Sequence, residues 1–128
     1  MKSVVICGSC RFKLEIKEFA KKLKDLGVVV YAPYLHSGQN EWNNLSDTYK
    51  KFTALGLTHD HFYKIKMADV VFVYNKHGYS GNSTTLEIGC AAAMGKPIYA
   101  LSADNDELCR NVLFREIIPS PEQLVKRL

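Results

Sequence analysis

Residues 70–94 read VVFVY-NKHGYSGNS-TTLEIGCAAAM. An uninterrupted apolar run is followed by a loop rich in glycine and hydroxyl side chains, and then by a segment of small residues. This order predicts a strand, a loop and a helix, because a continuous apolar run suits a strand buried on both faces of a sheet. The loop can present backbone N–H groups and hydroxyls to an anion at the start of the helix.

The rest of the chain repeats this alternation of apolar runs and amphipathic segments. Further strands are predicted at residues 3–7, 28–32, 98–101 and within 112–118. Helices are predicted at residues 12–26, 58–67 with Thr58 as N-cap, 84–94, near 107–110 and from Pro121 onward, with a weak helical stripe between Trp42 and Phe52. Together these elements predict one α/β domain over residues 1–128, a three-layer, doubly wound parallel sheet of about five strands, flavodoxin-like or Rossmann-like.

Composition and charge narrow the classes of function. The 128 residues are 47% hydrophobic and 23% charged, and the net charge of +4 comes from basic residues mixed with acidic ones. No basic stripe for a nucleic-acid polymer is evident, and a small anionic substrate suits the weak positive field. No stretch approaches the roughly 20 apolar residues of a membrane span. The run at residues 4–7 is too short for a signal peptide, and four cysteines fit a reducing compartment, so we expect a cytoplasmic protein without membrane contact.

Ligands of doubly wound sheets bind at the carboxyl ends of the strands. This rule places the loops after the first, third and fourth strands, and the start of the Thr58 helix, at the ligand edge. Two of these segments, the loops after the first and third strands, are the candidate anion-binding loops. Asp69 precedes its strand and therefore falls on the opposite edge. The candidate binding residues that these two loops contribute are Gly8, Ser9, Arg11, Asn75, Gly81, Asn82 and Ser83.

The first loop, Cys7-Gly8-Ser9-Cys10-Arg11, has three interpretations. The C-x-x-C spacing could form a redox pair, and the segment could also be a plain strand-to-helix turn. The interpretation that we favour is an anion site. Gly8 permits a tight turn, Ser9 offers a hydroxyl and an N–H, and the guanidinium of Arg11 suits phosphate oxygens.

Glu87 lies in the opening turns of the helix that follows the second loop. A glutamate there can simply complement the helix dipole. The functional alternative is a nucleophile that attacks an anomeric carbon and forms a glycosyl ester, as in retaining glycosidases.

The run His59-Asp60-His61 contains further candidates. Residues at i and i+2 do not share a helix face, so we expect no metal site here. Asp60 and His61 are candidate catalytic residues, as a general acid or as contacts to sugar hydroxyls, and surface capping is the alternative.

Four motifs resemble the nucleoside 2-deoxyribosyltransferase superfamily. They are C-G-S-x-R at residues 7–11, A-D-V-V-F-V at 68–73, G-Y-S-G-N-S-T-T-L-E-I-G-C-A at 78–91 and G-K-P-I at 95–98. The resemblance implies a flavodoxin-like fold, a homodimer or larger homo-oligomer, and no metal or organic cofactor. It also implies cleavage of the N-glycosidic bond of a nucleoside or nucleotide, with Glu87 as the nucleophile.

Two branches of the superfamily are relevant. Transferases exchange the bases of free deoxynucleosides, whereas 2′-deoxynucleoside 5′-monophosphate N-hydrolases carry a phosphate-binding G-S-x-R motif. Gly8, Ser9 and Arg11 match that motif, which favours the hydrolase branch. A base-exchanging transferase and a non-catalytic nucleotide-sensing module remain alternatives.

The chain also departs from the family pattern. Where the hydrolases have a carboxylate before the third strand, this sequence has His61, with Asp60 one residue away, so the general acid and the sugar stay open. The resemblance further suggests that a polar residue after the fourth strand, Asn111 or Asn105, reaches the site of a neighbouring subunit. Residues 37–52 are expected to form a lid.

Overall fold

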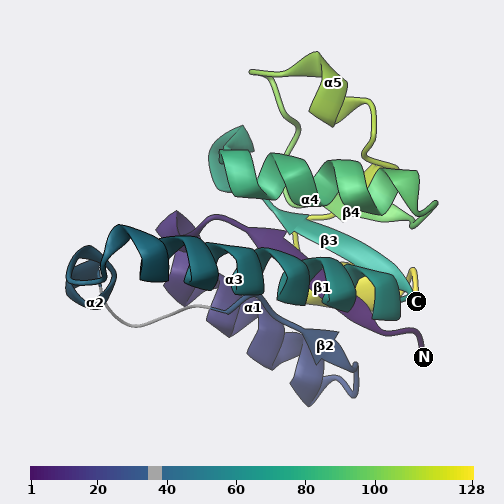
Figure 1. Ribbon diagram of the computed structural model, residues 1–128. Helices are drawn as coiled ribbons and strands as arrows, with labels where there is room; N and C mark the ends of the chain where they lie inside the picture. The colour runs from purple at the N-terminus through teal and green to yellow at the C-terminus, as the bar shows by residue number, and fades with distance from the viewer. Residues whose placement is uncertain (35–38) are drawn as a thin grey trace.

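The computed structural model describes residues 1–34 and 39–128 (Figure 1). Within these residues a parallel sheet has the strand order β2-β1-β3-β4-β5. The strands are β1 (Val4–Gly8), β2 (Val30–Tyr31), β3 (Val70–Tyr74), β4 (Ile98–Ala100) and β5 (Glu116–Ile117). Because the chain moves outward first to one side of β1 and then to the other, the predicted doubly wound α/β class is confirmed.

Helices cover both faces of this sheet (Figure 1). α3 and α4 lie side by side on one face, and α1 and α6 pack together against the other. None of the described helices is long and apolar enough to cross a bilayer. The helices are α1 (Lys13–Asp25), α2 (Gln39–Asn43), α3 (Asp47–Met67), α4 (Asn82–Ala93), α5 (Leu108–Asn111) and α6 (Pro121–Val125), with short 3-10 turns η1 (Cys10–Phe12) and η2 (Lys76–Gly78).

The central strands β1 and β3 are buried on both faces, as their unbroken apolar runs predict. Alternate side chains of β1 enter different cores: Ile6 packs with α1, and Val5 packs with α3 and α4. On the α1 face the Phe19 and Phe72 rings stack with centroids 4.6 Å apart. Each such aliphatic or aromatic side chain contributes about 1.5–3 kcal/mol to folding stability when it is fully buried. The packing of the two central strands therefore fixes the position of the loops that follow them.

The predicted start of the long helix is wrong. α3 begins at Asp47, where the Ser46 hydroxyl accepts the Tyr49 N–H at 3.3 Å and forms the N-cap. Thr58 lies inside the helix, and its hydroxyl donates to the Ala54 carbonyl at 2.7 Å. Tyr49 and Phe52 are 66% and 67% exposed. Because this part of the helix is not buried, its sequence lacks the regular spacing of apolar residues that marks a buried helix face.

Smaller differences occur at other boundaries. β2 covers only Val30–Tyr31 of the predicted 28–32, and α4 begins at Asn82 instead of residue 84. Of the predicted lid, residues 37 and 38 lie outside the described parts of the chain. The rest forms α2 and the start of α3.

Candidate active site

A cavity of about 440 Å³ opens at the carboxyl ends of β1 and β3, between α3 and α4. This volume lies within the range of small-molecule sites in proteins. Four segments line it: Gly8, Ser9 and Cys10 after β1; Pro33 and Tyr34 after β2; Leu57, Thr58, His61 and Phe62 on α3; and Gly81, Asn82, Ser83, Thr84, Leu86 and Glu87 at the start of α4. The cavity therefore lies where the strand order reverses, as the sequence predicts.

The turn after β1 is fixed by close packing. A Cβ at Gly8 would lie 2.7 Å from Ile16 Cδ1 and 3.1 Å from the Tyr74 carbonyl oxygen, so no other residue fits without a shift of its neighbours. Ser9 caps η1, because its hydroxyl oxygen accepts the Arg11 N–H at 3.1 Å. Gly8 and Ser9 line the cavity, as predicted.

Arg11 does not line the cavity. Its side chain is exposed, and its guanidinium carbon lies 3.6 Å from the centroid of the Tyr79 ring. This cation–π contact joins the loop after β1 to the loop after β3. A contact of this kind at an exposed site contributes about 0.5–1 kcal/mol.

The loop between β3 and α4 is pressed against the loop after β4. Gly78 has a φ of 76°, and a Cβ there would lie 2.8 Å from the Ala103 carbonyl oxygen. Asn75 reinforces this junction, because its amide donates to the Ser102 carbonyl at 2.8 Å and its oxygen accepts the Ser102 N–H at 2.9 Å. The close approach holds the start of α4 in place.

The first turn of α4 has no side-chain cap. Its N-cap residue is Gly81, and Asn82 and Ser83 follow it at the cavity wall, both exposed. The first N–H groups of a helix have no intrahelical acceptor, and the helix dipole places partial positive charge there. This turn can therefore bind an anion from the cavity.

Glu87 lies one turn further along α4, at the cavity wall and 9% exposed. Burial raises the pKa of its carboxyl group to about 8, against a smaller opposite effect of the Cys7 thiol. The carboxyl group consequently holds a proton at pH 7 in the absence of ligand. Glu87 and the free first turn of α4 face the same cavity.

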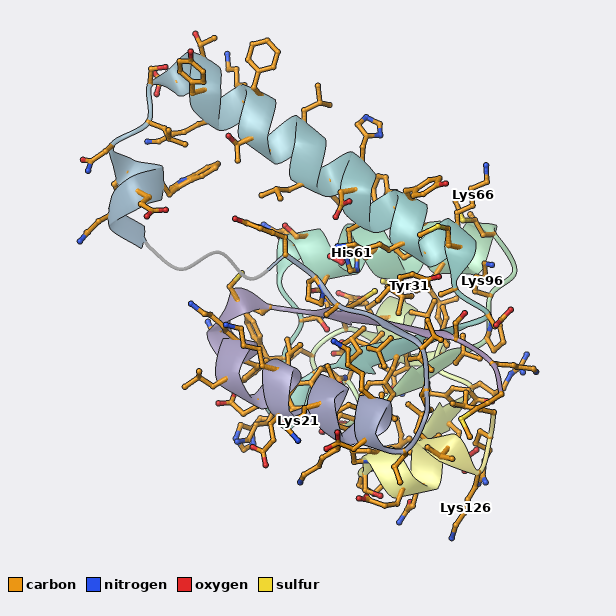
Figure 2. All side chains as sticks on the ribbon, turned by 90° about the horizontal axis from the view of Figure 1, so that it is seen from below. Lys21, Tyr31, His61, Lys66, Lys96 and Lys126 are labelled. Carbon is orange, nitrogen blue, oxygen red and sulfur yellow. The ribbon has the colours of Figure 1, made fainter. Side chains whose placement is uncertain are left out.

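His61 approaches Glu87 from α3. Figure 2 shows its ring on the side of α3 that faces the body of the protein, and Nε2 lies 3.2 Å from Glu87 Oε2. Burial lowers the pKa of His61 to about 4, and Lys64 adds to this effect. At neutral pH the contact therefore joins an uncharged imidazole and an uncharged carboxyl group, and no ion pair forms.

Two buried polar atoms of this pair lack a hydrogen-bond partner, His61 Nδ1 and Glu87 Oε2; the Oε2–Nε2 contact does not have hydrogen-bond geometry. Ser80 Oγ is a third such atom. An unsatisfied buried polar group costs about 1–3 kcal/mol, and groups of this kind in a cavity wall are typical of functional sites.

The structure separates the predicted site residues into two sets. Gly8, Ser9, Gly81, Asn82, Ser83, His61 and Glu87 come together around the cavity. Asp60 does not join them: it is exposed and forms an ion pair with Lys64 at 2.8 Å. Asn75 bonds to Ser102 through both its amide nitrogen and its amide oxygen, and the Asn111 side-chain oxygen accepts the Asp104 N–H at 2.9 Å.

Sequence reasoning missed Cys7 and the α3 wall. Cys7 Sγ lies 3.3 Å from His61 Nε2, and burial raises the pKa of its thiol, with Glu87 adding to the effect. Cys7 and Cys10 are both free thiols. Leu57 and Phe62 line the same cavity as His61, and the i, i+4 spacing of Leu57 and His61 was the available signal.

A profile of the nucleoside 2-deoxyribosyltransferase family matches residues 6–120. The chain belongs to this family. Enzymes of the family act on the N-glycosidic bond of nucleosides or nucleotides, and the resemblance seen in the sequence motifs is confirmed. No curated protein matches the chain significantly in sequence.

Solved structures with low sequence identity share the fold of this family member. A 2-deoxyribosyltransferase from Bacillus psychrosaccharolyticus has a TM-score of 0.66 at 16% identity, with 95% of this chain and 89% of that chain covered. The CMP N-glycosidase BcmB from Clostridium botulinum has a TM-score of 0.57 at 20% identity, covering 98% and 97%. A conserved protein from Enterococcus faecalis V583 has a TM-score of 0.59 at 17% identity, covering 100% and 99%.

Proposed function

We propose that this chain is an N-glycosidase that cleaves the base–sugar bond of a nucleoside or 2′-deoxynucleoside 5′-monophosphate through an ester of Glu87. The observation that carries the proposal is the position of Glu87 in the cavity wall, one turn after the uncapped start of α4. One side of the cavity thus offers a carboxyl nucleophile and an anion-binding turn roughly 6–7.5 Å apart along the helix axis. A nucleoside monophosphate has an anomeric carbon and a phosphate on one sugar.

The phosphate would bind the Ser9 hydroxyl and the first N–H groups of α4. Arg11 would leave Tyr79 to join it. A hydrogen bond to a charged group contributes about 1.5–3 kcal/mol, more than the cation–π contact that would be given up. Arg11 therefore becomes a binding residue only when a phosphate is present.

In the reaction, the carboxylate oxygen of Glu87 attacks C1′, the C1′–N bond breaks, and the electron pair leaves with the base. The Glu87 proton must first be lost to solvent, because His61, with a pKa of about 4, is a much weaker base than the Glu87 carboxylate, with a pKa of about 8. Water then hydrolyses the ester, which releases the sugar phosphate and restores the carboxyl group. A retaining enzyme needs its acid about 5–5.5 Å from the nucleophile, across the sugar, so His61 is too close to protonate the departing base.

A base-exchanging transferase is the second candidate, because the family description names that activity. The chemistry is shared until the ester forms. The two functions then differ in whether a second base or water attacks C1′. The solved relatives named as a deoxyribosyltransferase and as a CMP N-glycosidase show that this fold serves both kinds of reaction and more than one sugar.

We further propose that the protein works as a homodimer or larger homo-oligomer through α3 and α4. The first half of α3 extends past the sheet (Figure 2), and apolar side chains stay exposed along α3 and on α4. Phe52 is 67% exposed, Leu55 57%, Tyr63 60%, and Leu86 on α4 61%. A second copy of the chain would cover this surface. A monomer in sedimentation velocity at micromolar concentration would contradict the proposed homo-oligomer.

The test is chromatography of free base after incubation with each common ribo- and deoxynucleoside monophosphate. The wild type is compared with Glu87→Gln, which keeps the size and the neutral form of the side chain. Base release by the wild type alone supports the proposal, and the preferred nucleotide identifies base and sugar. Release only after a second base is added assigns the transferase. Binding without any release would overturn both and indicate a nucleotide sensor.

A further inference from the structure

Three side chains with metal-ligating atoms meet at the inner wall of the cavity. Cys7 comes from the end of β1, His61 from α3 and Glu87 from α4. One ligand atom from each lies within 4.8 Å of both others. The three residues are buried, with exposed fractions of 0%, 6% and 9%. Because they come from three different elements, the packing of these elements determines the distances between their side chains.

The separations between these atoms suit one small cation. Tetrahedral zinc sites have Zn–N and Zn–O bonds of about 2.0–2.2 Å and Zn–S bonds of about 2.3 Å, which places ligand atoms roughly 3.3–3.6 Å apart. Here Cys7 Sγ is 3.3 Å from His61 Nε2, which is 3.2 Å from Glu87 Oε2. A cation bound by all three needs only small side-chain rotations.

The chemistry of the three groups favours a borderline-soft dication. Thiolate and imidazole prefer Zn²⁺ or Co²⁺ over Mg²⁺ or Ca²⁺, and a carboxylate completes the set. Glu87 Oε2 is buried without a hydrogen-bond partner, so a cation would provide the partner that it lacks. Since His61 and Glu87 line the cavity, the fourth coordination position is open to it.

We propose that Cys7, His61 and Glu87 form a binding site for Zn²⁺ or a similar dication. A ligating histidine normally donates its second N–H to an acceptor, and His61 Nδ1 has none among the described residues, so we expect this site to bind its ion more weakly than a structural zinc site does. The ion is therefore held reversibly. On the function proposed above, its binding occupies the nucleophile, so metal and nucleotide exclude each other.

The test uses Co²⁺ as a spectroscopic substitute for Zn²⁺, added to the reduced protein in a buffer free of phosphate. We expect a thiolate-to-cobalt charge-transfer band that saturates at one ion per chain and disappears when Zn²⁺ is added. Cys7→Ser should abolish the band. Cys109→Ser removes an exposed thiol that does not line the cavity and should leave the band unchanged. Absence of the band in the wild type, or its persistence in Cys7→Ser, would overturn the proposal.

Glu87→Gln provides a second test that keeps the buried thiol. Loss of a direct ligand should weaken cobalt binding by at least about tenfold. Mutation of a residue that only hydrogen-bonds to a metal ligand already lowers metal affinity by about 10- to 100-fold. Unchanged affinity in this variant would overturn the three-ligand site even if Cys7→Ser fails to fold. The spectra do not depend on activity, so a protein that releases no base but shows the band retains the metal site while losing the proposed function.

Discussion

The raised pKa of Glu87 makes folding stability depend on pH in a direction that one substitution can isolate. The folded protein keeps the Glu87 proton up to about pH 8, whereas the unfolded chain releases it near the ordinary value of 4.5. Between these two values the folded state binds more protons, so the free energy of unfolding falls as pH rises. Glu87→Gln carries no such proton, and its stability lacks this decline.

The expected size of the effect follows from the proton linkage. The stability of Glu87→Gln relative to the wild type should grow by about 1.4 kcal/mol per pH unit. His61 ionises mainly below pH 6.5, so the clean window runs from pH 6.5 to 8. Because the slope halves as the pH reaches the folded pKa of Glu87, the difference grows by about 1.6 kcal/mol across this window.

The assay is urea denaturation of both proteins across that window, with a chelator present to keep them free of metal. Both proteins bury the same residues, so the slopes of their unfolding free energy against urea concentration should be equal. The difference in stability then appears as a difference between the urea midpoints. His61 is common to both proteins, so its own titration largely cancels in the comparison. A stability difference that stays constant with pH would refute the buried, protonated Glu87.

Three other expectations follow from the same geometry. Base release should increase with pH through about pH 8, because attack needs the Glu87 carboxylate; a profile already flat at pH 6 would contradict this. Arg11→Ala should raise KM for nucleotides about 10- to 100-fold and barely change KM for nucleosides, and equal effects on both would exclude the phosphate contact. Gly78→Ala should lower the free energy of unfolding by more than about 1 kcal/mol in thermal melts, given its φ of 76° and the close Ala103 carbonyl. Gly89→Ala, in open space on α4, is the matched control and should leave stability unchanged or raise it.

The sequence was sufficient to predict the parallel sheet and the side of the site formed by the loops after β1 and β3. Val70–Tyr74 and the loop after it predict β3, α4 and Glu87, because burial on both faces leaves an unbroken apolar run and topology places the loop at the ligand edge. The start of α3 was not predictable from periodicity, because Tyr49 and Phe52 remain exposed.

The contacts inside the site depend on packing between elements that are distant in sequence. Cys7 and His61 are 54 positions apart, and no local pattern indicates that their side chains meet. Arg11 was predicted from its motif as a phosphate ligand, but its observed partner, Tyr79, lies in another loop. Local patterns therefore predict which loops form the site, and only the packed structure shows which atoms touch.

The close contact between Gly78 and the loop after β4 limits how this cavity can be changed to accept a new substrate. The wall formed by the start of α4 has no room for insertions or larger residues at that junction, so its shape is fixed by the sheet beneath it. The opposite wall is made of side chains on α3, and Leu57 among them belongs to neither core cluster, so it can change size without disturbing a strand. Directed evolution for a different base should therefore collect its mutations on α3 and leave the loop after β3 untouched.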